Sequence, residues 1–202
     1  MENYADMDFY NKIDFIAGTV RGTEKMALLA EELDELADAA EIFKNTIKEK
    51  RTKRGRRYTM NQYAMERMIS EFADVMAVMM CTFHPEDLKY AMEWADMQIE
   101  NTRIRTGADL KKELNELIFA CKALRTMAFK HRRIGSKDNP TDRTREYVNM
   151  MIGVHIPLMI AEMFIIMHPE QVPEWDKKLD SKINRWYDRL MQLQGSDENE
   201  QE

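Results

Sequence analysis

The apolar residues of this chain recur at the spacing of helices rather than of strands. Between Thr23 and Lys50, apolar side chains three or four positions apart form one stripe: Met26, Leu29, Leu33, Leu36, Ala40 and Phe43. Thr23 belongs to a residue type that caps helix N-termini. The pattern therefore predicts a helix over residues 23–50. The same reasoning predicts helices over residues 4–17, 59–83 and 86–105.

Turn-forming residues are scarce in this sequence. It contains 7 Gly and 5 Pro among 202 residues, whereas an average protein has roughly 7% Gly and 5% Pro. Few turns mean long elements, and we expect an all-α fold in the form of a helical bundle. A chain of this length buries about 70% of its unfolded surface, so one core suffices without disulfides. Cys81 and Cys121 lie in apolar helical patterns, and we expect both to be buried free thiols.

The order of motifs in the first half of the chain returns in the second half. The stretch from Leu29 to Leu36 aligns with the stretch from Leu110 to Leu117, and His84-Pro85-Glu86 recurs as His168-Pro169-Glu170. We interpret this as a tandem duplication. It predicts one repeat over residues 1–107, a second over residues 108–194, and a flexible acidic tail over residues 195–202. The two repeats are expected to form one compact bundle.

A pair of acidic residues interrupts an otherwise apolar helix. From Phe72 to Phe83 every residue except Asp74 and Thr82 is apolar, so this helix should be buried on most faces and Asp74 should point into protein. Glu71 lies three residues earlier and therefore on the same side. Buried carboxylates cost several kcal/mol each unless a cation pairs with them. The pair therefore needs a positive partner.

The helix over residues 23–50 offers further carboxylates at this point instead of a cation. Packing its apolar stripe against the next long helix brings Glu32 and Glu35 to Glu71 and Asp74. Four like charges repel one another, and a divalent metal resolves the conflict. Oxygen ligands without His or Cys favour Mg²⁺, with Mn²⁺ as the other candidate. Glu31 is a further candidate ligand, and a solvated acidic face is the alternative interpretation of residues 31–35.

These acidic motifs resemble the signature of a known superfamily. Glu31-Glu32-x-x-Glu35 followed by Glu71-x-x-Asp74 is similar to the pattern of the all-α nucleoside triphosphate pyrophosphohydrolases. That superfamily includes MazG-like enzymes, dimeric dUTPases, dCTP pyrophosphatases and phosphoribosyl-ATP pyrophosphohydrolase. The resemblance is strong over residues 23–106 and weak over the second half of the chain.

The resemblance implies an activity and a site. The expected reaction is Mg²⁺-dependent hydrolysis of a nucleoside triphosphate, with a deoxyribonucleotide as the expected substrate, to the monophosphate and pyrophosphate. It implies that Glu32, Glu35, Glu71 and Asp74 are the metal-binding and catalytic residues, with Glu35 or Glu32 orienting the attacking water. In the second repeat, His155 and Leu158 replace the second acidic pair, so that repeat is degenerate. It would supply the packing partner of a single-chain pseudo-dimer, and a homodimer is also open.

Members of this superfamily bind phosphates through Lys, Asn and Arg on the helix after the second acidic motif. In this chain Asn101 and Arg103 fit, whereas Met97 and Gln98 stand where a lysine is often found. Lys89 or the basic stretch over residues 48–57 is expected to substitute for that lysine. The substrate-binding candidates are therefore Lys89, Asn101, Arg103 and Arg105. A cationic helix C-terminus favoured by the helix dipole is the alternative interpretation of the last two arginines.

The basic stretch over residues 48–57 stands out in a chain of net charge −6. A solvated loop, a lid over a triphosphate and a nucleic-acid contact are three interpretations of it. Nucleic-acid binding is not expected, because only Tyr58 supplies an adjacent aromatic ring. No apolar run is long enough to cross a membrane, and no signal peptide is recognisable at the start, so a cytoplasmic protein is expected. The alternative function is that of a catalytically inactive helical interaction protein that keeps the fold.

Overall fold

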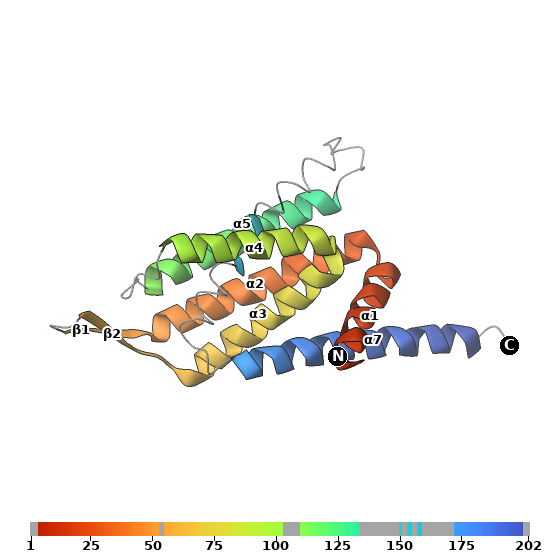
Figure 1. The fold of residues 1–202 in the computed structure, drawn as a ribbon, viewed down its shortest axis with the longest axis horizontal. Coiled ribbons are helices and arrows are strands. Elements are labelled where there is room, and N and C mark those ends of the chain that lie inside the picture. Colours follow the sequence, from red (N-terminus) through yellow and green to blue (C-terminus); the bar gives the residue numbers. More distant parts are fainter. Residues whose placement is uncertain are drawn as a thin grey trace.

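Helices make up nearly all of the part of the chain that the computed structural model describes, which is residues 4–52, 55–102, 110–133, 150, 153–154, 157–158 and 172–199. Figure 1 shows them as long rods that pack side by side. The helices are α1 (Tyr4–Thr19), α2 (Gly22–Thr46), α3 (Gln62–Thr82), α4 (Pro85–Thr102), α5 (Leu110–Arg132) and α7 (Val172–Asn199). The predicted helical bundle is confirmed. The tandem duplication stays a prediction.

The basic stretch between α2 and α3 forms a hairpin, where the sequence predicted a loop. Strands β1 (Lys48–Thr52) and β2 (Gly55–Thr59) pair antiparallel, with Lys48 opposite Thr59. This pairing shortens the predicted helices, because the backbone of residues 48–52 and 55–59 bonds across the hairpin instead of along a helix axis. The register also sets Lys50 opposite Arg57.

The starts of α2 and α3 differ in how they are capped. α2 begins at Gly22 rather than at Thr23, and its N-cap residue, Arg21, makes no capping hydrogen bond with its side chain. α3 begins at Gln62, after Asn61, whose side-chain oxygen accepts a hydrogen bond from the backbone N–H of Ala64 at 3.1 Å. The cap satisfies one of the free N–H groups of the first turn of α3.

We expect Asn61→Ala to destabilise the protein by about 1 kcal/mol, since alanine offers no acceptor to the first turn of α3. In a chain of this size that corresponds to a fall in melting temperature of roughly 2–4 °C, measurable by circular dichroism. Asn61→Asp is the matched control, because aspartate caps equally well. An unchanged melting temperature in the alanine variant would show that the cap contributes nothing.

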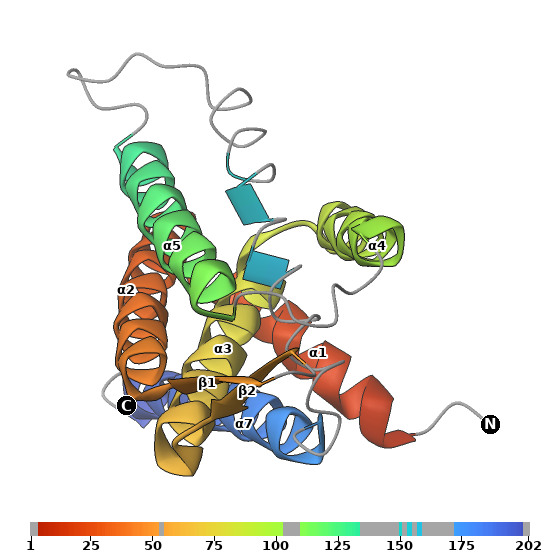
Figure 2. The same cartoon turned by 90° about the vertical axis from the view of Figure 1, so that its left-hand side faces the viewer.

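Helix α3 lies at the centre of the bundle and borders two cores (Figure 2). It packs on α2 on one side and on α7 and α1 on the other. Val75, Val78 and Met79 belong to the larger core, which α2 and α5 complete, whereas Ala77 and Cys81 belong to the smaller core with residues of α1 and α7. This position explains why no residue of α3 from Phe72 onward is exposed, as the apolar run predicted.

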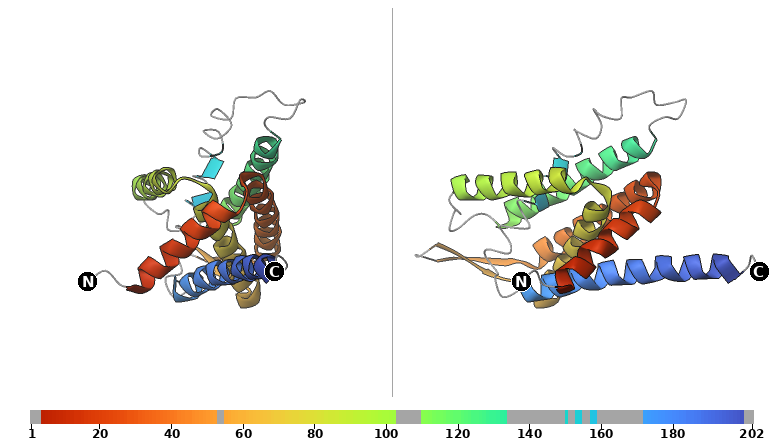
Figure 3. Two further views of the ribbon diagram at one scale, coloured as in Figure 1. Left: turned by 90° about the vertical axis from the view of Figure 1, so that its right-hand side faces the viewer. Right: turned by 45° about the vertical axis from the view of Figure 1, so that its right-hand side comes forward.

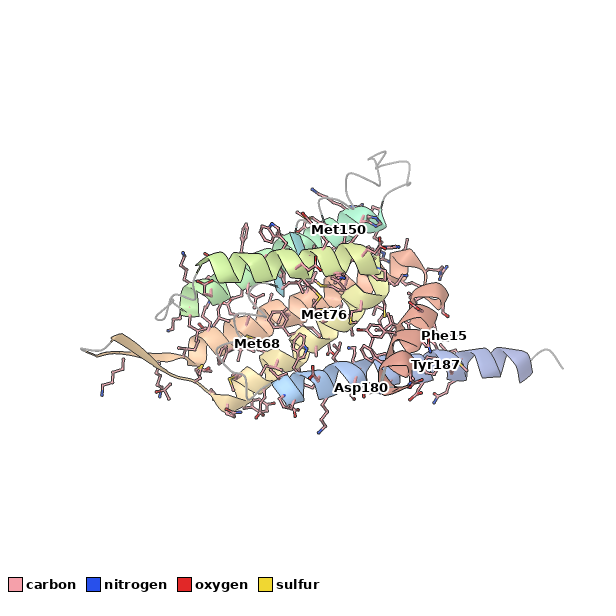
Figure 4. All side chains as sticks on the ribbon, in the orientation of Figure 1. Phe15, Met68, Met76, Met150, Asp180 and Tyr187 are labelled. Atoms are coloured by element: carbon pink, nitrogen blue, oxygen red, sulfur yellow. The ribbon has the colours of Figure 1, made fainter. Side chains whose placement is uncertain are left out.

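Helix α1 crosses α3 and fixes the position of α7 beneath it (Figure 3). The aromatic rings of Phe15 and Tyr187 meet edge to face, with 5.1 Å between their centroids, and Figure 4 labels both side chains. Nearby, the ammonium of Lys12 donates a hydrogen bond to the side-chain oxygen of Asn184 at 2.8 Å. These contacts anchor the middle of α7 against the rest of the bundle. α7 continues to Asn199, so the helix includes residues 195–199 of the expected tail.

Both cysteines are buried and free, as predicted. Burial raises the pKa of the thiol of Cys81 and that of Cys121 to about 12, so neither forms a thiolate at neutral pH. Among the helices described here, none has the length and apolar character needed to cross a membrane.

Candidate functional site

Three carboxylates come together where α2, α3 and α7 meet. Oxygen atoms of Glu32, Glu71 and Asp74 lie within 4.8 Å of one another. Glu32 is only 8% exposed, and the side chains of Glu71 and Asp74 are 14% and 18% exposed. We call these three residues the acidic triad. The triad confirms that Asp74 points into protein and that Glu71 lies on the same side of α3.

The apolar stripe of α2 places the first member of the triad. Leu29, Leu33 and Leu36 are fully buried against α3 and α5. Glu32 precedes Leu33 by one residue and therefore lies at the edge of this stripe, where packing draws it into the junction with α3. On α3, Glu71 and Asp74 are three residues apart and project toward the same side. Burial of the stripe thus brings the two acidic motifs into contact.

A lysine of α7 supplies the cation that the sequence argument did not find. The ammonium of Lys182 donates a hydrogen bond to a carboxylate oxygen of Glu32 at 3.0 Å, and it lies 3.2 Å from a carboxylate oxygen of Asp74. The sequence predicted a metal ion in this role, whereas the structure places Lys182, 150 residues after Glu32, beside Glu32 and Asp74. The sequence shows that Lys182, Arg185 and Arg189 share one helix face, but it does not show which helices that face meets.

The charge of Lys182 does not balance the triad. Among the described residues, three carboxylates face one ammonium group, and the further cation Arg67 pairs with Glu71 at 3.8 Å. Burial, followed by repulsion from Glu35 and Asp74, raises the pKa of Glu71 to about 7. The pKa of Glu32 is also raised, since burial outweighs its hydrogen bond with Lys182. The site therefore retains an unpaired negative charge that favours a proton or a cation.

The surroundings of the triad favour the charged form of the Lys182 ammonium group, whereas they disfavour the charged forms of Glu32 and Glu71. Burial alone would lower the pKa of Lys182, but its hydrogen bond with Glu32 and the charges of Glu32 and Asp74 raise the pKa above the usual lysine value. Lys182 is therefore charged at neutral pH. It remains a fixed positive charge at one edge of the triad.

Two of the predicted ligands lie outside the triad. Glu31 and Glu35 are both exposed on α2. Glu35 is nevertheless close enough for its negative charge to raise the pKa of both Glu71 and Glu32. It thus lies at the solvent-facing rim of the site, whereas the structure gives Glu31 no contact with the triad among the residues described.

The candidates for phosphate binding on α4 are not brought to the triad by any contact within the described residues. Lys89 is an exposed side chain paired with Glu93 at 3.9 Å. Asn101 belongs to α4, but its side chain is not described, and Arg103 and Arg105 lie outside the described residues. These four assignments stay predictions.

The donor set of the triad fits a metal ion. It offers carboxylate oxygens from two rigid helices, and the described chain brings no His or Cys side chain into the group. Hard divalent cations are bound by oxygen ligands of this kind. Neither a protein-family model, nor a curated protein sequence, nor a solved structure matches this chain.

Proposed function

We propose that the protein hydrolyses a nucleoside triphosphate, with deoxyribonucleotides preferred, to the monophosphate and pyrophosphate with the help of Mg²⁺. The observation that supports this proposal is the acidic triad, whose negative charge exceeds the charge of its lysine partner. Burial of such a group destabilises the fold unless a ligand compensates. A buried cluster of oxygen ligands with raised pKa values is typical of a functional site.

The triad residues Glu32, Glu71 and Asp74 would hold the metal, with Mn²⁺ as a substitute for Mg²⁺. The bound ion supplies Lewis-acid neutralisation of charge on the phosphate oxygens. Lys182 would add a second positive charge beside Glu32 and Asp74. Because Lys182 lies at one edge of the triad, it can also turn toward a phosphate without leaving α7.

Glu35 is the residue that we propose to orient the attacking water. It is exposed, so water reaches it, and it lies outside the triad, so it is not needed as a ligand. The water oxygen forms a bond to the α-phosphorus while the bond from that phosphorus to the bridging oxygen of the leaving pyrophosphate breaks. The water proton passes to the carboxylate of Glu35. Glu32 is less suited to this role because it is buried and hydrogen-bonded to Lys182.

The test is pyrophosphate release from the canonical ribo- and deoxyribonucleoside triphosphates, with Mg²⁺ and with EDTA. We expect one or more substrates to give monophosphate and pyrophosphate only when Mg²⁺ is present, and Mn²⁺ to restore the activity after chelation. Release of orthophosphate instead of pyrophosphate would contradict attack at the α-phosphorus. No hydrolysis of any substrate would contradict the proposal.

A non-catalytic interaction protein is the second candidate, and Lys182 is the observation that favours it. An ammonium group between Glu32 and Asp74 is the kind of internal counter-charge that stabilises a carboxylate cluster without a metal. The two candidates differ in their response to Mg²⁺. A site that binds the ion should stabilise the fold by about 2.7 kcal/mol at a hundredfold excess over Kd, whereas an internal ion cluster should show no shift in melting temperature.

A further inference from the structure

A pocket of about 160 Å³ opens beside the acidic triad, and its lining includes Glu32 of the triad and Lys182, which pairs with the triad. Leu28 of α2 and Val78 of α3 form an apolar wall. The remaining lining residues are Arg185, Trp186 and Arg189 of α7. The pocket is therefore an extension of the candidate metal site along α7.

The α7 side of this pocket is cationic. Lys182, Arg185 and Arg189 succeed one another at intervals of three and four residues and line the same pocket. Within the described ranges neither arginine forms an ion pair; Arg185 donates only its Nε–H, to the backbone oxygen of Ser181 at 3.3 Å. Both guanidinium groups are exposed, and they line the pocket side by side with Lys182. Their free N–H donors are available to an anion.

The spacing of the cations along α7 matches a chain of several linked anionic groups rather than a single anion. At a rise of about 1.5 Å per residue, Arg185 lies about 4.5 Å and Arg189 about 10.5 Å beyond Lys182 along the helix axis. Guanidinium groups bind phosphate oxygens through two parallel hydrogen bonds. A row that starts at the triad therefore suits a polyphosphate whose first phosphate lies near the carboxylates.

We infer that Arg185 and Arg189 form the binding site for the pyrophosphate arm of the substrate, in the pocket along α7. The inference rests on the proposed function, because the substrate is the nucleoside triphosphate proposed there. It places phosphate recognition on α7, whereas the sequence predicted it on α4 and the residues that follow. In this arrangement the α-phosphate lies at the triad and the two outer phosphates lie along the arginine row. Trp186, half-buried in the same wall, closes the pocket with Leu28 and Val78.

The experiment is isothermal titration of inorganic tripolyphosphate with Mg²⁺ into the full chain, comparing the wild type with Arg185→Gln, Arg189→Gln and the double variant. Each removed charge-assisted hydrogen-bond donor should weaken binding roughly 10-fold or more, and the double variant roughly 100-fold. Arg132→Gln is the matched control, since it removes one exposed arginine from α5, which does not line the pocket. Its affinity should stay within about twofold of the wild type. Because both α7 arginines are exposed, the variants should retain the wild-type circular dichroism spectrum.

The outcomes separate this inference from the proposed function. Loss of tripolyphosphate binding in the double variant, with an unchanged Mg²⁺-induced shift in melting temperature, supports the arginine row as the phosphate site. Equal affinities in the wild type and the double variant would overturn it, whether or not the protein hydrolyses nucleotides. If tripolyphosphate binds through the two arginines but no triphosphate is hydrolysed, the phosphate site stands and the proposed hydrolysis is wrong.

Discussion

Asp74→Asn is expected to lower Mg²⁺-dependent pyrophosphate release by roughly 10³-fold or more. The substitution removes one negative oxygen ligand from the acidic triad while keeping the size of the side chain, so only Glu32 and Glu71 of the triad would be left to hold the proposed metal. Charge neutralisation by a bound metal is worth several kcal/mol in the transition state, and each 1.36 kcal/mol is a factor of ten in rate. The measurement is kcat/KM for the best substrate of the nucleotide panel.

A second readout shows whether the loss arises at the metal site. The Mg²⁺-induced rise in melting temperature should shrink in Asp74→Asn. Asp38→Asn is the matched control, because Asp38 is an exposed residue of α2 away from the triad, and it should keep both the activity and the rise. If Asp74→Asn folds normally and hydrolyses nucleotides at the wild-type rate, Asp74 is not part of a catalytic site.

Three of the carboxylates were predictable from sequence because burial of an apolar helix face draws in the acidic residues beside it. The apolar run after Glu71 required α3 to be buried on most faces, so Asp74 had to point into protein. On α2 the apolar stripe predicted that both Glu32 and Glu35 would join the site. Only Glu32 is buried, whereas Glu35 remains exposed at the rim, because the stripe does not state how far around the helix the contact with α3 extends.

The cationic partner could not be predicted by the same rule. Lys182 lies 150 residues after Glu32, and no helical period links positions on different helices. Its approach depends on how α1 and α7 pack, through contacts such as that between Phe15 and Tyr187. The amphipathic pattern of α7 predicts a helix, but it does not state which face meets α2 and α3. Long-range packing therefore decides the electrostatics of the site.

The hairpin between α2 and α3 shows a different limit. Residues 48–59 are rich in Lys and Arg, which form helices readily and are depleted or neutral in strands. Local propensity therefore predicted a longer α2 and a loop. The structure pairs β1 with β2 instead, and the backbone N–H and C=O groups of the two strands satisfy one another. Backbone pairing between the strands overrode the propensity of individual residues.

Glu71→Gln is expected to make the stability of the metal-free protein less dependent on pH. The pKa of Glu71 is about 7 in the folded state and close to 4.3 in an unfolded chain. The folded state therefore binds the proton more tightly. The tighter binding of this proton by the folded state contributes stability that is fully present below pH 4.3 and is lost as the pH rises through 7. Each pKa unit corresponds to about 1.4 kcal/mol, so the loss relative to low pH amounts to about 3–4 kcal/mol by pH 8.

The measurement is urea unfolding in EDTA at pH 5, 6, 7 and 8. Between pH 5 and 8 the free energy of unfolding of the wild type should fall more steeply than that of Glu71→Gln, because glutamine has no proton to lose. At pH 8 the variant should be more stable than the wild type. Glu66→Gln is the matched control, since Glu66 is exposed on the same helix, and its pH dependence should follow that of the wild type.

Adding Mg²⁺ should reverse the order of the two proteins at pH 8. The ion competes with the proton for the carboxylate of Glu71, so its stabilisation of the wild type should grow as the pH rises from 6 to 8. Glu71→Gln keeps only two charged members of the triad and should gain less from the ion at every pH. If the wild type and Glu71→Gln show the same pH slope and the same response to Mg²⁺, the raised pKa and the metal site must both be rejected for Glu71. A changed slope with no response to Mg²⁺ would instead favour the ion cluster with Lys182 as a purely structural feature.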